Sequence, residues 1–159
     1  MRSPSSNFDL RTALSDEVRG ALAELEHNNG SGKAIHACRV RLKRARSLAR
    51  VGYAFAPGLS AVFNDSARGI MRSLAEARNL AALAKAARML AKRSKRRAAE
   101  SLKAASRALE EAREQAAAVD LEAVNAGLRD LLALAQVWPE PSARQVKRGA
   151  RRVARRARK

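Results

Sequence analysis

A stripe of basic side chains within residues 33–51 is the feature of this sequence best suited to bind a ligand. Plotted as an α-helix, at about 100° per residue, this segment places five side chains within an arc of about 80°: His36, Arg39, Lys43, Arg46 and Arg50. Arginine offers a planar fork of donors that fits two phosphate oxygens, and lysine offers a compact positive charge. Histidine can donate a hydrogen bond whether it is neutral or charged. The stripe therefore predicts a site for an anion.

Apolar residues border this stripe on both sides, Ile35 and Leu42 on one and Val40 and Val51 on the other. A solvated helix face usually merges into further polar residues, so these borders favour a stripe that lines a groove within a helical fold. The opposite interpretation is a solvated face in an arginine-rich protein, where some basic stripes arise by chance. The spacing alone leaves both interpretations open.

Other basic residues have weaker patterns. Arg78, Lys85 and Lys92 repeat every seven residues, on the side of their helix opposite its apolar face. Periodicity alone favours solvated positions for them, because soluble helices place their cations there. Arg41 falls inside the apolar arc of the 33–51 helix, so it must pair with an acid, extend to solvent or line a second surface.

The sequence contains no arrangement typical of catalysis or of metal binding. Cys38 lies on the apolar face of its helix, which favours a small buried hydrophobe over a nucleophile. Glu110, Glu111 and Glu114 have the spacing of a helix surface, and no glycine-rich phosphate loop is present. We therefore expect no enzyme activity, no catalytic residue, no metal site and no cofactor.

The composition favours a helical protein with a polyanionic partner. Hydrophobic residues make up 47% of the 159 residues, aromatic residues only 3%, and the net charge is +18. Residues 35–99 carry 16 Lys and Arg against two acids, and residues 144–159 carry nine and no acid. A charge this large causes self-repulsion, so it needs a partner or another reason, and the obvious partners are polyanions: nucleic acid, polyphosphate or an anionic membrane. Scarce aromatics disfavour single-stranded nucleic acid, whose binding depends on base stacking. With no apolar run long enough for a membrane span and no signal peptide, we expect a soluble, intracellular protein and no membrane partner.

The elements that must position the stripe are helices throughout. We expect a loose leader at 1–7, a first helix at 8–27, a turn at 27–32 and the basic helix at 33–51. A third helix at 59–74 should carry Val62, Ile70 and Leu74 inward, with Arg68 and Arg72 elsewhere on its surface. Further helices are expected from 78, from 98 and from a cap at Asp120, with an exposed end or linker at 92–97 and a last helix capped by Ser142. These patterns predict an all-α antiparallel bundle of about six to seven helices with a basic groove.

The basic helix resembles the signature of the CHAD family, the conserved-histidine α-helical domain. That signature is a His, an Arg three residues on followed by an apolar residue, then paired bases and another Arg. Here these are His36, Arg39, Val40, Lys43, Arg44 and Arg46. A second family motif, Leu-Gly-x-x-Arg-Asp, is similar to the segment Leu74–Asn79, which contains Arg78 but has Ala75 for the Gly and Asn79 for the Asp.

The resemblance implies a non-enzymatic protein that binds inorganic polyphosphate. It implies a binding site formed by the following residues: His36, Arg39, Lys43, Arg44, Arg46, Arg50, Arg72, Arg78 and Lys85. Arg78 and Lys85 would form the wall opposite the stripe. It also implies a bacterial cytoplasmic location at polyphosphate granules. The alternative function is a non-specific DNA- or RNA-binding basic helical protein.

Family members are built of two similar halves around a basic channel. Residues 8–138 resemble the first half, and residues 139–159 resemble the helix that opens the second, after which the sequence stops. We therefore expect either a fragment of a longer protein or a half-domain that forms a homodimer and completes a two-half channel.

Overall fold

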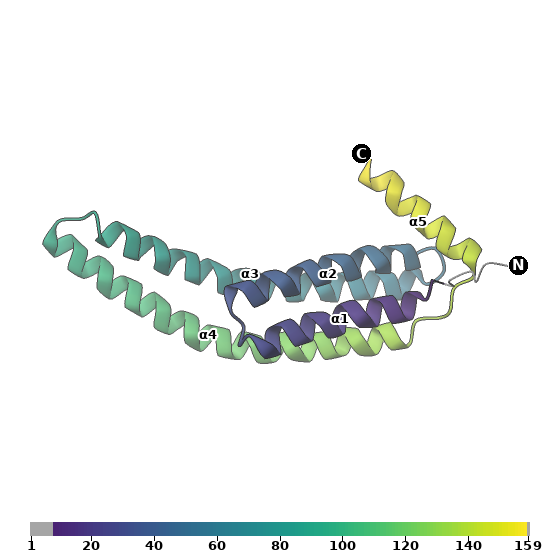
Figure 1. The fold of residues 1–159 in the computed structure, drawn as a ribbon, viewed down its shortest axis with the longest axis horizontal. Helices are drawn as coiled ribbons and strands as arrows, with labels where there is room; N and C mark the ends of the chain where they lie inside the picture. Colours follow the sequence, from purple (N-terminus) through teal and green to yellow (C-terminus); the bar gives the residue numbers. More distant parts are fainter. Residues whose placement is uncertain (1–7, 159) are drawn as a thin grey trace, which may run out of the picture.

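The computed structural model describes residues 8–158, without the side chains of residues 76–78, 81 and 116–120. The described residues form five helices and no strand (Figure 1): α1 (Leu10–His27), α2 (Gly32–Gly52), α3 (Pro57–Ala91), α4 (Arg96–Gln136) and α5 (Ala143–Ala157). The first four pack as an antiparallel bundle, and α5 leaves it at the end where the N-terminus lies. The predicted all-α fold class is confirmed. The predicted leader at 1–7 lies outside the described residues.

The α1–α2 hairpin forms where the sequence predicts it. The Asp9 carboxylate accepts backbone N–H groups in the first turn of α1, and the Ser31 hydroxyl does the same for α2. Between them, Asn29 (φ 44°) and Gly30 (φ 63°) adopt the left-handed conformation. Asparagine and glycine adopt it at low cost, so the chain can reverse within a few residues and return α2 alongside α1.

Helices α3 and α4 are longer than the sequence patterns indicate. The expected end of the third helix at 74 and the expected start of the next at 78 both fall inside α3, and the expected cap at Asp120 falls inside α4. The cap prediction is wrong: α4 passes through this position without interruption. Neither stretch contains proline or glycine, and both are rich in alanine, which favours helix continuation. An aspartate can cap a helix, but it does not force one to begin.

The distal halves of α3 and α4 extend past α1 and α2 as a two-helix arm (Figure 1). Small residues hold the arm together: Ala84 and Ala91 are buried, and the Ser106 hydroxyl donates a hydrogen bond to the Ala84 carbonyl oxygen. The short connection at its tip begins at Lys92, within the segment 92–97 that was predicted as an exposed end or linker.

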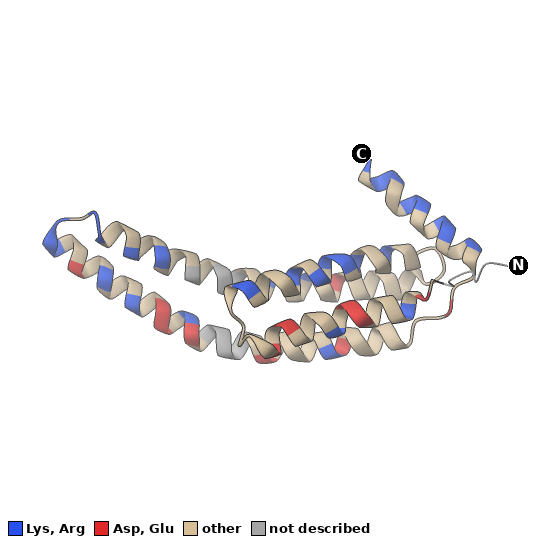
Figure 2. Cartoon of the chain, in the orientation of Figure 1, with Lys and Arg blue, Asp and Glu red and all other residues tan. Residues whose placement is uncertain are grey.

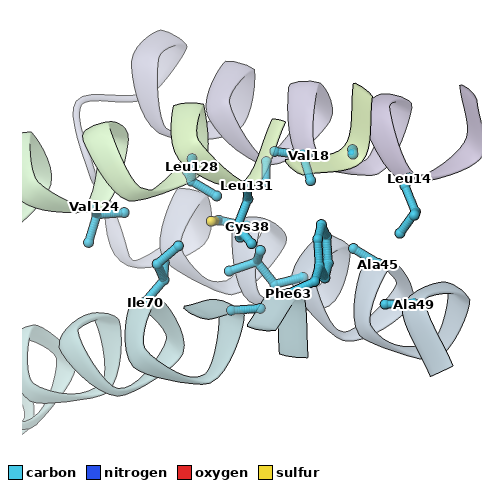
Figure 3. Packing of buried hydrophobic residues seen from close by; sticks show 14 of the residues in the cluster. Leu14, Val18, Cys38, Ala45, Ala49, Phe63, Ile70, Val124, Leu128 and Leu131 are labelled. Carbon is cyan, nitrogen blue, oxygen red and sulfur yellow. The ribbon is translucent and has the colours of Figure 1, made fainter. Parts of the chain in front are cut away.

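The hydrophobic core lies between the first four helices (Figure 3). The apolar side of α1 is buried at Leu10, Leu14, Val18 and Leu25. On α3, Ile70 and Leu74 point inward as predicted, but Val62 is 52% exposed. The neighbouring Phe63 is fully buried instead, because it shares the inward-facing arc of the helix with Ala67, Ile70 and Leu74.

Trp138 closes the end of the bundle from which α5 leaves. Its ring is fully buried and meets Phe63 edge to face, with ring centroids 5.8 Å apart. Its carbonyl oxygen accepts hydrogen bonds from the Arg11 guanidinium, at 3.0 and 2.7 Å. Gly52 lies against the ring, and a Cβ at this position would come within 2.6 Å of it. Trp138 thus joins α4 to α1, to α3 and to the last turn of α2.

Cys38 is a buried core residue, and its thiol is expected to be unreactive in the folded protein. Burial raises the pKa of the Cys38 thiol to about 12, so that the reactive thiolate is scarce at neutral pH. A thiol reagent at pH 7.5 should therefore label Cys38 only after a denaturant has unfolded the chain. Rapid labelling of the native protein, followed by mass spectrometry, would contradict this packing of α2.

Candidate anion-binding surface

The basic stripe lies along one side of α2, as its spacing predicts. His36, Lys43 and Arg50 are exposed, whereas Arg39 and Arg46 are half-buried. In Figure 2, blue segments, which mark Lys and Arg, recur along the length of α2. The Ser31 cap fixes the start of the helix, and the buried face, with Ala34, Cys38 and Leu42, fixes its rotation. Together they leave the stripe open to solvent.

Arg46 connects the stripe to α3. Its Nε donates to Asn64 Oδ1 at 3.4 Å, and its Nη1 lies 4.0 Å from Met71 Sδ. The same pairing of α2 with α3 is fixed nearby by Ser60, whose buried hydroxyl donates to the Ala49 carbonyl oxygen at 2.8 Å. These contacts define the register of the two antiparallel helices.

The electrostatic surroundings of Arg46 are dominated by other cations. Partial burial lowers the pKa of the Arg46 guanidinium, and the positive charges of Arg50 and Arg68 lower it further. The Asp65 carboxylate acts in the opposite direction, but it is the last of the four causes. Arg68, which the sequence pattern assigned only to the helix surface, thus adds a cation from α3. An anion bound here would relieve the repulsion among these charges.

Arg44 does not lie on the stripe. Its Nη1 lies 4.0 Å from Glu17 Oε1, and Arg41 Nη1 lies 3.4 Å from Glu17 Oε2. Both guanidiniums therefore turn toward α1. Of the three alternatives that the sequence left open for Arg41, the structure shows pairing with an acid. The Arg41 guanidinium lies across Gly20. Arg44 is adjacent to Lys43 in sequence, but on a helix the two side chains differ in direction by about 100°.

The three predicted binding residues that belong to α3 lie at different positions along it. Arg72 is exposed on α3, next to Met71 in sequence. Arg78 lies within α3, but its side chain is outside the described part of the chain. Arg46 pairs with Asn64 and Ala49 with Ser60, so the start of α2 is level with about residue 78 of the antiparallel α3. Lys85 lies two turns, about 10 Å, beyond that level. The structure therefore does not bring Lys85 to the stripe.

Lys85 belongs instead to a separate basic hollow on the arm. This hollow has a volume of about 440 Å³ and is lined by Lys85, Arg88, Met89, Lys92 and Arg113. One of its cations, Arg88, forms an ion pair with Glu110 across the arm. The two clusters are thus separate surfaces of one molecule.

Helix α5 contributes to the site in a way that sequence reasoning missed. A capping box between Ser142 and Gln145 starts the helix, and Gly149 packs directly on the Val51 carbonyl of α2. Arg152 lies over the ring of Tyr53, with its Cζ 4.1 Å from the ring centroid. The available signal was the apolar spacing of Val146, Gly149 and Val153, which marks one face of α5 for packing.

The contact between α5 and α2 forms a second basic hollow, next to the end of the stripe. Its volume is about 240 Å³, and it is lined by Ser47, Arg50, Tyr53, Arg152, Val153, Arg156 and Ala157. Arg50 is therefore shared between the stripe and this hollow. We refer below to the space with this lining as the α2–α5 hollow.

A comparison with protein-family models gives one decisive match. The model of the CHAD domain matches residues 13–159, which is nearly the whole chain. The chain belongs to the CHAD family. The match spans both the bundle and α5, and CHAD domains are linked to polyphosphate binding. Searches of curated proteins and of solved structures found no match.

Two further observations describe this CHAD domain. Among the described residues, no group of three or more His, Cys, Asp or Glu side chains is placed to hold a metal ion. No helix in the described part of the chain combines the length and the apolar character needed to cross a membrane.

Proposed function

We propose that this CHAD domain binds inorganic polyphosphate through the α2 stripe and catalyses no reaction on it. The residues that would contact the phosphate chain are His36, Arg39, Lys43, Arg46 and Arg50, with Arg68 and Arg72 on the neighbouring helix. We also propose that the protein acts in the bacterial cytoplasm at polyphosphate granules. Membership of the CHAD family supports polyphosphate as the ligand, and the arrangement of charges on α2 supports the stripe as its binding site.

The observation that carries the proposal is the contrast between the two sides of α2. On one side, Arg41 and Arg44 pair with Glu17. On the other, Arg39, Lys43, Arg46 and Arg50 form no ion pair with any acid in the described part of the chain. Cations crowded together without acids repel one another, and a bound polyanion would convert that repulsion into attraction.

The spacing of the stripe suits a linear polyanion. The cations recur at about one per helical turn, and each turn rises about 5.4 Å. A chain of phosphate groups, each carrying a negative charge, can therefore meet a positive charge repeatedly along the helix. Arg46 is half-buried and its guanidinium contacts Asn64, so this side chain loses less freedom when the ligand binds.

Non-specific binding of nucleic acid is the second candidate function, and one observation favours it. Along α5 runs a cluster of cations with no acid among them, and two of them, Arg152 and Arg156, also line the α2–α5 hollow: Arg144, Lys147, Arg148, Arg151, Arg152, Arg155 and Arg156. Such a surface attracts any phosphate backbone. However, Phe63 and Trp138 are fully buried, so neither can stack on a base.

A competition experiment distinguishes the two functions. Labelled polyphosphate bound to the protein is displaced with unlabelled polyphosphate or duplex DNA at equal charge and physiological salt. We expect polyphosphate to displace the label at the lower concentration. Because counterions are released on binding, the affinity should also fall about tenfold or more between 50 and 200 mM salt.

Stronger displacement by duplex DNA would overturn the proposal in favour of the second function. Phosphate release from polyphosphate in the presence of magnesium would contradict the absence of catalysis. Sedimentation in the same buffers tests the homodimer that is one of the two expectations from the family's two-half architecture, because pairing of two copies doubles the sedimenting mass.

A further inference from the structure

The α2–α5 hollow lies at the closed end of an angle between two helices. At Gly149 the backbone of α5 rests on α2, since a Cβ there would overlap the carbonyl oxygen of Val51. From this contact α5 rises away from the bundle (Figure 1). Residues Arg152 and Arg156 follow the contact along α5, and Arg50 and Ser47 precede it along α2. The two helices thus form a wedge-shaped space whose narrow end is closed by packed backbone.

The lining of this space combines three guanidiniums with a small apolar wall. Arg50 comes from α2, and Arg152 and Arg156 come from α5. Val153 and Ala157, each directly after one of these two arginines in sequence, supply the apolar part of the lining. Tyr53 holds Arg152 by a cation–π contact, so this guanidinium has a defined position before any ligand arrives. The hollow has a volume of about 240 Å³. Small anionic groups therefore fit.

The hollow also lies on the line of the stripe. Arg50 is the last cation of the stripe and the first of the hollow, so a phosphate chain that follows α2 toward its C-terminal end arrives between Arg50, Arg152 and Arg156. The contact of Gly149 with Val51 prevents the chain from continuing between the helices. The hollow is therefore closed at its narrow end, and a phosphate chain that enters it must end there.

We propose that the α2–α5 hollow binds the terminal phosphate group of the chain, so that the protein prefers polyphosphate ends over internal segments. This inference rests on the proposed polyphosphate function and adds a specificity to it. A terminal phosphate differs chemically from an internal one because it has a second ionisable oxygen, with a pKa near 6 for phosphate monoesters. Three guanidiniums around one group favour the doubly charged form, which can accept several charge-assisted hydrogen bonds at once.

The test compares two ligands with the same number of phosphorus atoms, linear triphosphate and cyclic trimetaphosphate, which has no end. Their affinities are measured by calorimetry at pH 7.5 for the wild-type protein and for two charge-matched double variants. Arg152→Ala with Arg156→Ala removes the two cations that α5 contributes to the hollow and keeps Arg50. Arg151→Ala with Arg155→Ala removes two cations at the same spacing from the outer side of the same helix.

We expect the wild-type protein and the Arg151→Ala/Arg155→Ala control to prefer linear triphosphate to a similar degree. The Arg152→Ala/Arg156→Ala variant should lose roughly tenfold or more of that preference, since it lacks two charged hydrogen-bond donors. Arg156→Ala alone should show part of the loss while keeping the Arg152–Tyr53 contact that helps to hold α5. The preference should also shrink at pH 5.5, where the terminal phosphate carries less charge.

Equal loss of preference in the two double variants would overturn the inference, because it would reflect net charge alone. A wild-type protein that binds long polyphosphate but does not distinguish linear from cyclic triphosphate would also overturn it, and would leave the proposed function standing. Failure to bind long polyphosphate at all would overturn both.

Discussion

Replacing Arg39 and Lys43 together by alanine is expected to weaken polyphosphate binding by about a hundredfold and to leave the helical content unchanged. The two side chains are one turn apart in the middle of the α2 stripe, and Arg39 is half-buried. Each charged hydrogen bond contributes about 1.5–3 kcal/mol, and about 1.4 kcal/mol corresponds to a factor of ten in affinity. Solvent screening reduces the contribution of the exposed Lys43. Titration of a fluorescent polyphosphate, with circular dichroism of the same samples, measures both effects.

The matched control is Lys103→Ala with Arg107→Ala. It removes one lysine and one arginine at the same spacing from exposed positions of α4 on the arm, so the net charge falls equally. We expect this control to weaken binding only severalfold, through the long-range field of the protein. A similar affinity for both double variants would show that the α2 stripe is an ordinary solvated face.

Replacing Trp138 by alanine should have the largest effect on stability. The ring is fully buried against Phe63 and Gly52, so its removal leaves a cavity at the end of the bundle. Truncation of a buried tryptophan costs about 3–5 kcal/mol, which lowers the melting temperature of a chain this long by roughly 10 °C or more. Thermal or urea unfolding followed by circular dichroism measures the loss.

Two further variants separate packing from other causes. Val137→Ala changes a neighbouring side chain that is 65% exposed, and its melting temperature should stay within a few degrees of wild type. Trp138→Phe keeps an aromatic ring and removes an indole N–H that has no hydrogen-bond partner among the described residues. It should therefore cost less than alanine does. Equal melting temperatures for Trp138→Ala and Val137→Ala would contradict the core position of Trp138.

The helices near the N-terminus could be predicted well because their boundaries are encoded locally. The turn at Asn29 and Gly30 uses residues that tolerate a left-handed backbone, and Ser31 is a typical helix cap. No comparable signal distinguishes one long helix from two short ones. Asp120 is favoured as a helix cap, whereas the alanines before it favour a continuing helix, so local preference alone could not predict α4 as continuous.

The features of the candidate site also fall into two groups, those that the local sequence predicts and those that depend on how the helices pack. Helical periodicity alone predicts that Arg39, Lys43, Arg46 and Arg50 share one side of α2, and the structure agrees. The positions of side chains relative to other helices are tertiary facts. The turning of Arg44 toward Glu17 and the contact of Gly149 with Val51 depend on how helices pack, which no single segment encodes.

The order in which the helices pack has a consequence for how the chain folds. α1 contacts α2, α2 contacts α3 and α3 contacts α4, so each of these contacts joins neighbours along the sequence. Such contacts close short loops, lose little chain entropy and form quickly. The contact of α1 with α4 must instead wait until both ends of a long segment meet, and Arg11 and Trp138 join there. We therefore expect the helical hairpins to assemble first. The contact between α1 and α4 should form late and should be the rate-limiting step of folding.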